Sequence, residues 1–296
     1  MKVLMITGDK NFKPGNERYE LQKSAVESLA VVYWGRGSLW PALPAGHFEV
    51  VTAQDPLWRG VFGLYVANKI SARANIQVHM DLEELSWWKY ILAKIVLRRA
   101  DSIRVVSEKI KKQVEKIKGK AKISVLPVFV DVSTFQHVVR RAHEGKPILW
   151  VGRFEAEKDP LRAIDVFKEV LQVEPAATLH MLGKGSLGQR MKEKAANLPV
   201  EFPGWQDPAR FFDTADAVLC TSLHESWGAS IVEALAAGVP VVAPDVGIAR
   251  EAGAIVVPRN KLAQKLVAVL KEGTQGKLLL RISTKEEWIH QWKNTL

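Results

Sequence analysis

The sequence predicts an α/β protein with two domains, each built on a parallel, doubly wound sheet. Short apolar runs rich in β-branched residues alternate with helical patterns along the chain, and this alternation is typical of βαβ units. At 296 residues the chain is long enough for two domains with separate hydrophobic cores. Its hydrophobic share of 47% and charged share of 25% are those of a globular protein.

The first half of the chain alternates strands and helices, beginning with a strand at residues 2–7. Glycine and proline predict a loop at residues 35–46, GRGSLWPALPAG. The other predicted strands are residues 31–34, 48–53, 75–80, 102–107 and 123–130, and the predicted helices are residues 17–30, 57–70, 81–99 and 108–117.

The second half repeats the pattern after a polar linker. Asp159 is expected to cap a helix that has Pro160 at its first position. The predicted strands are residues 147–151, 178–182, 200–202, 217–221, 239–244 and 255–257, and the other helices include residues 186–197, 208–215 and 261–272. We expect an N-terminal domain at 1–135, a linker at 136–146, a C-terminal domain at 147–283 and a terminal helix at 284–296.

Residues 225–247, ESWGASIVEALAAGVPVVAPDVG, predict a loop, a helix and a strand buried on both faces. Ser226 or Ser230 can cap the helix, and Gly238 suits the left-handed position just past its end. The start of the helix would present unpaired backbone N–H groups, which can bind an anion. A ligand with both hydroxyls and phosphates, such as a nucleotide sugar, suits this stretch.

Glu225 and Glu233 frame the start of this helix as an E-x7-E pair. The pair and its context resemble the retaining GT-B glycosyltransferases of the glycosyltransferase 4 type, which usually have Phe where this chain has Trp227. The resemblance is specific over residues 147–257 and looser over 1–146. It implies a GT-B fold, with two Rossmann-like domains facing each other across a cleft. It also implies transfer of a hexose from a nucleotide-diphosphate sugar to an acceptor hydroxyl, with retention of configuration and no protein nucleophile.

The resemblance also implies roles for individual residues of the second domain. Arg153 and Lys158, in GRFEAEK, match the family's cationic pair, and an Arg fork with a Lys point charge suits a diphosphate. Glu225 would accept hydrogen bonds from the transferred sugar and Glu233 from the donor ribose. The other implied donor contacts are the backbone N–H groups of Gly228, Ala229 and Ser230, and Trp205 in the loop that contacts the base.

In the first domain, His79 ends a predicted strand and matches the family's histidine near the reacting sugar. Gly8 and Gly15 follow the first strand, where they either admit a donor closely or form an ordinary βα turn. Asp55 either lines the acceptor side or caps the next helix. We therefore expect His79, Arg153, Lys158 and Glu225 to be catalytic, and Gly8, Gly15, Trp205, Gly228, Ala229, Ser230 and Glu233 to bind the donor.

We expect neither a metal nor a cofactor. The sequence contains no D-x-D, and its histidines lack zinc-ligand spacing. Residues 183–188 fit the dinucleotide fingerprint G-x-G-x-x-G, but they follow the second strand of their domain rather than the first. We interpret them as a tight turn.

The net charge of +10 lies entirely in residues 1–146, and residues 108–122 alone contribute a net charge of +5. This segment is either a solvated surface helix or a contact with an anionic membrane surface, with Trp87, Trp88 and Tyr90 as nearby anchors. Family members that act on lipids commonly attach through a basic patch on this domain. Nucleic acid is not an expected partner, because no basic–aromatic motif of the common RNA-binding modules occurs.

No apolar run approaches the roughly 18 residues needed to span a bilayer, and the first ten residues are too short for a signal peptide. We therefore expect a cytoplasmic protein, with peripheral attachment to the inner face of the membrane left open. The one cysteine, Cys220, is expected to be a buried, inert thiol. The alternative to an enzyme is a noncatalytic GT-B paralogue that acts as a binding or scaffold subunit.

Overall fold

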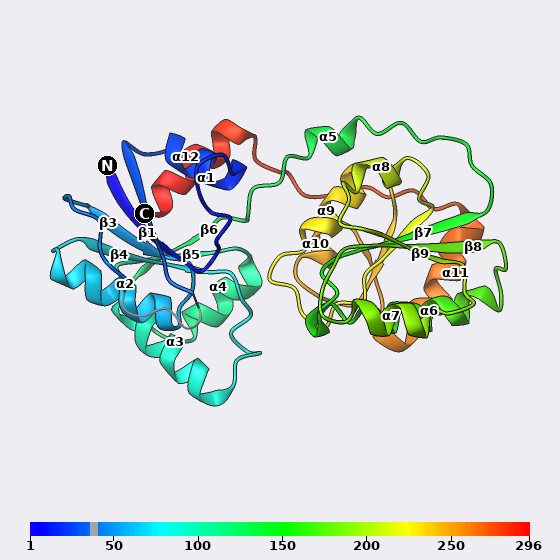
Figure 1. Ribbon diagram of the computed structural model, residues 1–296, viewed down its shortest axis with the longest axis horizontal. Coiled ribbons are helices and arrows are strands. Elements are labelled where there is room, and N and C mark those ends of the chain that lie inside the picture. Colours follow the sequence, from blue (N-terminus) through cyan, green and yellow to red (C-terminus); the bar gives the residue numbers. More distant parts are fainter. Residues whose placement is uncertain (36–40) are drawn as a thin grey trace. The chain divides into compact units, whose positions relative to one another are not determined.

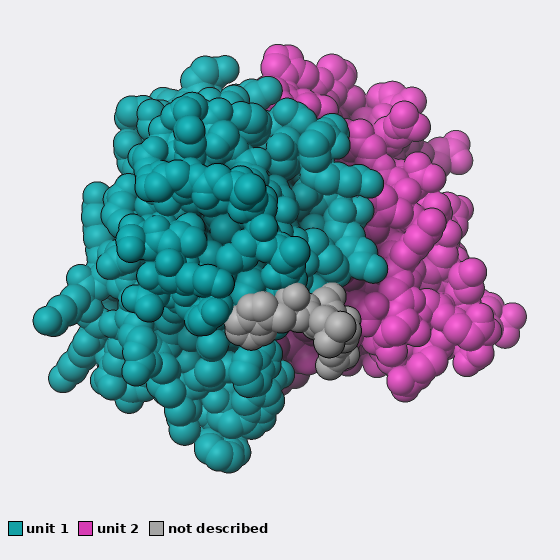
Figure 2. All heavy atoms as spheres, turned by 60° about the vertical axis from the view of Figure 1, so that its left-hand side comes forward, with its two compact units in different colours: residues 1–129, 283–296 teal, residues 130–282 magenta. Residues whose placement is uncertain are grey.

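The computed structural model describes residues 1–35 and 41–296. The chain forms two compact units, coloured separately in Figure 2: residues 1–129 with 283–296, and residues 130–282. The expected linker at 136–146 belongs to the second unit. The expected loop at 35–46 lies partly outside the described residues, because 36–40 are not among them.

The first unit contains a six-stranded parallel sheet in the order β2-β1-β3-β4-β5-β6 (Figure 1). The chain adds β2 on one side of β1 and all later strands on the other, so the strand order reverses between β1 and β3. The strands are β1 (Lys2–Thr7), β2 (Ser28–Tyr33), β3 (Val50–Ala53), β4 (Arg73–Val78), β5 (Ser102–Val105) and β6 (Lys122–Val125).

Helices cover both faces of this sheet (Figure 1). The helices α2 (Trp58–Lys69), α3 (Trp87–Arg99) and α4 (Glu108–Glu115) lie on one face, and α1 (Glu17–Ser24) and α12 (Lys285–Thr295) lie on the other. The last helix starts at a capping box formed by Thr284 and Glu287. Its Trp288 and Trp292, four positions apart, are buried in the same cluster as Val3 and form one apolar stripe on the helix.

Polar contacts add to the docking of α12 on the first sheet. Trp288 donates from Nε1 to the Pro127 carbonyl at 2.9 Å, and its ring lies 5.4 Å from the Arg104 guanidinium carbon. The Asn75 amide donates to the Thr295 carbonyl at 2.8 Å. The last helix is therefore part of the first unit, although the second unit separates it from the other residues of that unit along the chain.

The second unit also contains a six-stranded parallel sheet, in the order β12-β11-β10-β7-β8-β9. Its strand order reverses between β7, the first strand of this unit, and β10. The strands are β7 (Lys146–Val151), β8 (Ala177–Leu182), β9 (Val200–Gly204), β10 (Ala217–Leu219), β11 (Val241–Ala243) and β12 (Ile255–Val256).

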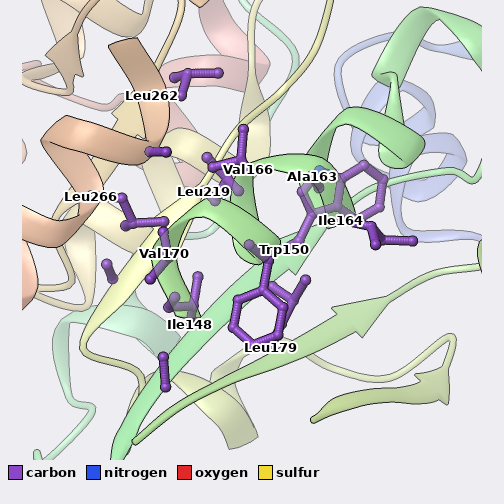
Figure 3. Close-up of a cluster of buried hydrophobic side chains, with 14 of the residues drawn as sticks. Ile148, Trp150, Ala163, Ile164, Val166, Val170, Leu179, Leu219, Leu262 and Leu266 are labelled. Carbon is purple, nitrogen blue, oxygen red and sulfur yellow. The ribbon is translucent and has the colours of Figure 1, made fainter. Parts of the chain in front are cut away.

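The core of the second unit lies between this sheet and the helices α6 (Pro160–Leu171) and α11 (Leu262–Glu272). Figure 3 shows Trp150, Ile164 and Leu179 within this cluster. The other face carries α8 (Ala209–Phe212), α9 (Ala229–Ala236) and α10 (Ala249–Ala252) (Figure 1). The remaining elements are α5 (Ser133–Gln136), α7 (Gly188–Lys194) and two single 3₁₀ turns, η1 (Ala156–Lys158) and η2 (Arg259–Lys261).

Two predicted helices of the first unit are shorter than expected. The helix predicted at 17–30 ends at Ser24, because residues from Ser28 onward pair with β1. The helix predicted at 81–99 begins only at Trp87. The Asp81 carboxylate accepts from the backbone N–H of Glu83 at 3.1 Å, which favours a turn in the preceding residues.

Candidate active site

The two loops that carry the central sequence motifs lie side by side at the carboxyl edge of the second sheet. Residues 152–159 follow β7, and residues 220–228 follow β10, and these two strands are neighbours. This is the point where the strand order reverses, and open α/β sheets bind their ligands outside the carboxyl ends of the strands at such a point. The topology therefore predicts the site before any side chain is considered.

Lys158 and Glu225 form an ion pair across these loops, although 67 positions separate them in the sequence. The Ser222 hydroxyl donates to Oε1 of Glu225 at 2.8 Å. The side chains of Lys158 and Glu225 are only 19% and 10% exposed, so solvent screens their attraction weakly. Two sequence-predicted residues are thus brought together as a shielded pair of opposite charges.

Thr221 connects the two loops through its hydroxyl. It accepts a hydrogen bond from Nε1 of Trp150 at 2.9 Å and donates to the Asp159 carbonyl at 2.9 Å. A backbone bond from the N–H of Leu223 to the Glu157 carbonyl, 2.9 Å long, adds a second connection. These bonds set the position of the Lys158–Glu225 pair on the rigid sheet.

Arg259 is a further part of the site that the sequence analysis missed. It follows β12 and donates to the carbonyls of Thr221 at 2.6 Å and Ser222 at 3.1 Å. It also pairs with the carboxylate of Asp159. The sequence did contain one indication of this residue. A cation directly after a short strand of the same parallel sheet lies at the carboxyl edge of that sheet, where the site is.

The expected capping role of the Asp159 side chain is wrong. Asp159 does occupy the N-cap position of α6, but its side chain makes no capping bond and pairs with Arg259 instead. Its φ of 44° is left-handed, a conformation that glycine adopts at lower cost. The ion pair with Arg259 offsets this strain.

The N-terminus of α9 is capped by Gly228, not by Ser226 or Ser230 as expected. Gly228 has a φ of 109°, and no side chain caps the helix. Within the described residues, the backbone N–H groups of Gly228, Ala229 and Ser230 find no acceptor. They lie on the loop that carries Glu225 and are available to an anion.

Close packing holds the loop before α9. Trp227 is 4% exposed, and its carbonyl accepts from the N–H of Ile248 at 2.9 Å. A Cβ on Gly247 would lie 2.2 Å from that carbonyl oxygen. Glycine is therefore required at the end of the central motif, because the two chain segments approach too closely for a side chain.

Glu233 lies on α9 and is half-buried. Burial, and secondarily the negative charge of Asp207, raise the pKa of Glu233 to about 7. No hydrogen bond or ion pair holds its carboxylate among the described residues, so both oxygens can accept from a ligand. Asp207, which follows β9, was another residue that the sequence analysis did not select.

Two of the expected site residues, one catalytic and one donor-binding, are strongly exposed. Arg153 is 62% exposed in its side chain and pairs with Glu157 at 2.7 Å instead of joining the Lys158–Glu225 pair. Trp205, just after β9, is 67% exposed. Both side chains are therefore free of dense packing, and neither contributes to the buried core of the unit.

The G-x-G-x-x-G segment is a tight turn, as expected. A Cβ on Gly183 would lie 1.8 Å from the Gly152 carbonyl oxygen, and the N–H of Phe154 donates to the Lys184 carbonyl at 2.9 Å. The N–H of Ser186 donates to the Glu155 carboxylate at 2.8 Å. The glycines thus let this turn support the loop that carries Lys158.

His79 belongs to the first unit, at the end of β4. Its Nε2 lies 3.1 Å from Oε1 of Gln77, an oxygen that also accepts from Arg104 at 2.9 Å. Because that oxygen can only accept, Nε2 of His79 carries the proton. Burial first, and then the charges of Arg104 and Arg18, lower the pKa of His79 to about 3. His79 is therefore a neutral hydrogen-bonding group near neutral pH.

The glycines after β1 have structural reasons of their own. Gly8 lies against Arg59, whose guanidinium a Cβ would meet at 1.9 Å, and Arg59 pairs with Asp55 at 2.5 Å. Asp55 also accepts from the N–H of Leu57 at 2.8 Å, so its carboxylate organises the turn before α2. Gly15 has a φ of 86°, which explains glycine at the turn before α1.

Within residues 1–35 and 41–296, no group of three or more His, Cys, Asp or Glu side chains could hold a metal ion. Over the same residues, no helix is long and apolar enough to cross a lipid bilayer. Cys220 is buried, and burial raises the pKa of its thiol.

Comparison with known proteins finds a family match in the second unit. Residues 145–272 match the family described as "Glycosyl transferases group 1". A GDP-mannose-dependent alpha-(1-6)-phosphatidylinositol dimannoside mannosyltransferase of Mycobacterium tuberculosis is 31% identical over 136 residues, which are 42% of this chain and 36% of that protein. An alpha-monoglucosyldiacylglycerol synthase of Streptococcus pneumoniae is 23% identical over 66% of this chain and 51% of its own length. The chain thus spans about a third to a half of these two relatives.

Solved structures share the fold of the whole chain. HepE of Anabaena, in complex with UDP and glucose, has a TM-score of 0.71 at 16% identity and covers 92% of this chain and 89% of its own. Sucrose-phosphate synthase of Thermosynechococcus elongatus has a TM-score of 0.73 at 14% identity and covers 100% and 94%. Together with the two parallel sheets, these likenesses define the GT-B class of glycosyltransferase folds.

The more specific assignment concerns the second unit. Residues 145–272 match the group 1 glycosyl transferases, in agreement with the expected resemblance to the glycosyltransferase 4 type.

Proposed function

We propose that this protein transfers a hexose from a nucleotide-diphosphate sugar to an acceptor hydroxyl, with retention of configuration. The observation that carries the proposal is the shielded Lys158–Glu225 pair, placed beside the free N–H groups of α9 in a glycosyl transferases group 1 domain. A cation and helix N–H groups suit the departing diphosphate, and a carboxylate suits sugar hydroxyls. The similar proteins support this choice, since one relative is GDP-mannose-dependent and one structural neighbour holds UDP and glucose.

The residues have separate roles in this proposal. Lys158 and the exposed Arg153 neutralise the charge that develops on the diphosphate as the sugar bond breaks. Glu225 orients the transferred sugar, and Glu233 accepts from the ribose. His79 of the first unit, a neutral imidazole whose Nε2 proton is donated to Gln77, accepts a hydrogen bond at Nδ1 near the reacting sugar. Trp205 contacts the base, and Gly8 and Gly15 allow the backbone to approach the donor closely.

A ligand screen followed by a turnover assay tests the proposal. UDP-, GDP- and ADP-sugars should be compared by thermal shift, because a ligand that binds only the native state raises its melting temperature. Lys158→Met should lower kcat/KM with the selected donor by roughly 10- to 100-fold, the effect of losing one charged contact. Lys192→Met, on the exposed surface of α7, is the matched control. Equal turnover by both variants would reject the site.

Two further features of the reaction are open to direct measurement. Retention predicts that the anomeric configuration of the product, read by NMR, equals that of the donor. The cations of the site predict turnover without a divalent metal, so EDTA should leave the rate unchanged. A noncatalytic paralogue would instead bind a nucleotide sugar without releasing product.

We also propose that the first unit attaches peripherally to an anionic membrane surface, on the cytoplasmic side. Residues 108–122 contain seven lysines, although Lys109, Lys111 and Lys116 already pair with carboxylates. The adjacent helix α3 exposes a continuous apolar stripe with basic residues around it. The stripe consists of Trp87, Trp88, Ile91 and Ile95, which are 76%, 44%, 47% and 44% exposed.

Exposed aromatic residues and lysines together suit a lipid interface, since the rings enter the headgroup region while each cation contributes about 1 kcal/mol. Sedimentation with liposomes tests this surface. Binding is expected to anionic but not zwitterionic vesicles, to fall with salt, and to weaken in Trp87→Ser/Ile91→Ser. Equal pelleting with both lipid types would contradict the proposal.

A further inference from the structure

The first unit contains a second candidate ligand site, beside the outer strand β2. A cavity of about 480 Å³ lies between the loop after β1 and the outer strand β2. Gly8 and Asp55 belong to the β1–β3 side, whereas this cavity lies on the β2 side. Its volume falls within the range of small-molecule sites, roughly 300–1,000 Å³.

The floor and walls of the cavity are apolar. Leu29, Val31 and Tyr33 alternate along β2 and therefore face the same side of the sheet. Phe12 and Tyr19 complete the wall, with their rings edge to face and their centroids 5.7 Å apart. Phe12 is 3% exposed and Tyr33 is 37% exposed, so the wall runs from the core to the surface.

The rim of the cavity is positively charged. Lys10 and Lys13 line it, and Nζ of Lys10 lies 5.8 Å from the centre of the Tyr33 ring. The one acidic lining residue, Asp9, is already paired with Arg18. Neither lysine has a carboxylate partner among the described residues, so the rim keeps two uncompensated positive charges.

The cavity is held open by the bonds of its own loop. The N–H of Asp9 donates to the Thr7 hydroxyl at 3.0 Å, and the N–H of Asn11 donates to the Asp9 carboxylate at 2.9 Å. Backbone bonds of 3.1 Å and 3.0 Å close the turns at Phe12 and Asn16. A preformed site of this kind loses little entropy when a ligand enters.

We infer that this cavity binds an amphipathic phosphate monoester, with its apolar group on the aromatic wall and its phosphate between Lys10 and Lys13. An apolar wall selects against a fully polar ion, and two lysines select against an uncharged or zwitterionic amphiphile. The same chemistry occurs in a soluble alkyl or aryl phosphate and in a lipid headgroup. The inference does not rest on the proposed transfer reaction.

Calorimetry with matched probes tests the inference on the full chain. Dodecyl phosphate below its micelle concentration should bind, whereas dodecyl phosphocholine and inorganic phosphate should bind at least about tenfold more weakly, because each lacks one half of the recognised group. Vesicles with and without phosphatidic acid distinguish a membrane source from a soluble one. Equal binding of the alkyl phosphate and the phosphocholine would overturn the inference.

Two variants tie the binding to the cavity. Lys10→Met/Lys13→Met should lower the affinity for dodecyl phosphate at least about tenfold, while Lys69→Met, an exposed lysine on α2, should not. Val31→Phe should fill the cavity and reduce binding without removing charge. If both cavity variants fold and bind as the parent does, the site is elsewhere and the inference fails.

Discussion

Replacing Glu233 with glutamine should stabilise the protein at alkaline pH and leave it unchanged in acid. Burial and the nearby Asp207 raise the pKa of Glu233 to about 7. The folded state therefore keeps, between pH 4.5 and about 7, a proton that the unfolded state releases. Stability falls as the pH rises through this window, because the folded state must then hold a poorly solvated charge. Glutamine has the same shape and no charge.

The size of the effect follows from the pKa. The pKa rises from 4.5 to about 7, and each unit corresponds to about 1.4 kcal/mol. The ionised carboxylate therefore costs the folded state up to roughly 3 kcal/mol above pH 7. For a unit of this size, the gain from Glu233→Gln at pH 8 should raise the melting temperature by several degrees. At pH 5, near the start of this window, the difference in melting temperature should be small.

Thermal and urea unfolding of both proteins from pH 5 to pH 8 measure this difference. Glu272→Gln, at an exposed carboxylate that ends α11, is the matched control and should show no such pH dependence. The reasoning is refuted if the stability difference between Glu233→Gln and the parent is the same at both ends of the pH range. The same variant should bind the donor more weakly, because an amide accepts from only one atom.

Three other outcomes are expected. Trp292→Ala should lower the free energy of unfolding by about 3–5 kcal/mol, because the ring is fully buried; an unchanged urea midpoint would contradict this. Arg259→Met should lower the melting temperature and weaken donor binding, because Arg259 holds the Thr221 carbonyl and the Asp159 carboxylate. The exposed Arg190→Met should do neither. Identical behaviour of the two variants would contradict this role of Arg259. Turnover in EDTA should equal turnover in buffer, and rescue of a lost rate by magnesium or manganese would disprove metal independence.

Much of the local structure follows from the sequence, because strand and helix patterns depend on neighbouring residues. The strand at 2–7 and the last helix lie where the periodicity predicts them. The predictions that are wrong are those that depend on contacts with residues far away in the sequence. Ser28 lies in a strand and not in the predicted helix, because it pairs with Lys2. The side chain of Asp159 does not cap α6, because it binds Arg259, which is 100 positions away in the sequence.

For the candidate site too, the sequence determined some features and the tertiary structure determined the others. The motifs identified Lys158, Glu225 and Glu233 because their residue types and spacing match a known family. The strand order alone decided that the first two meet, since it makes β7 and β10 neighbours. The raised pKa of Glu233 depends on burial and on Asp207, and neither has a local signal in the sequence. Helical and strand patterns act over a few residues, whereas charge pairing and desolvation depend on distances that only the folded chain sets.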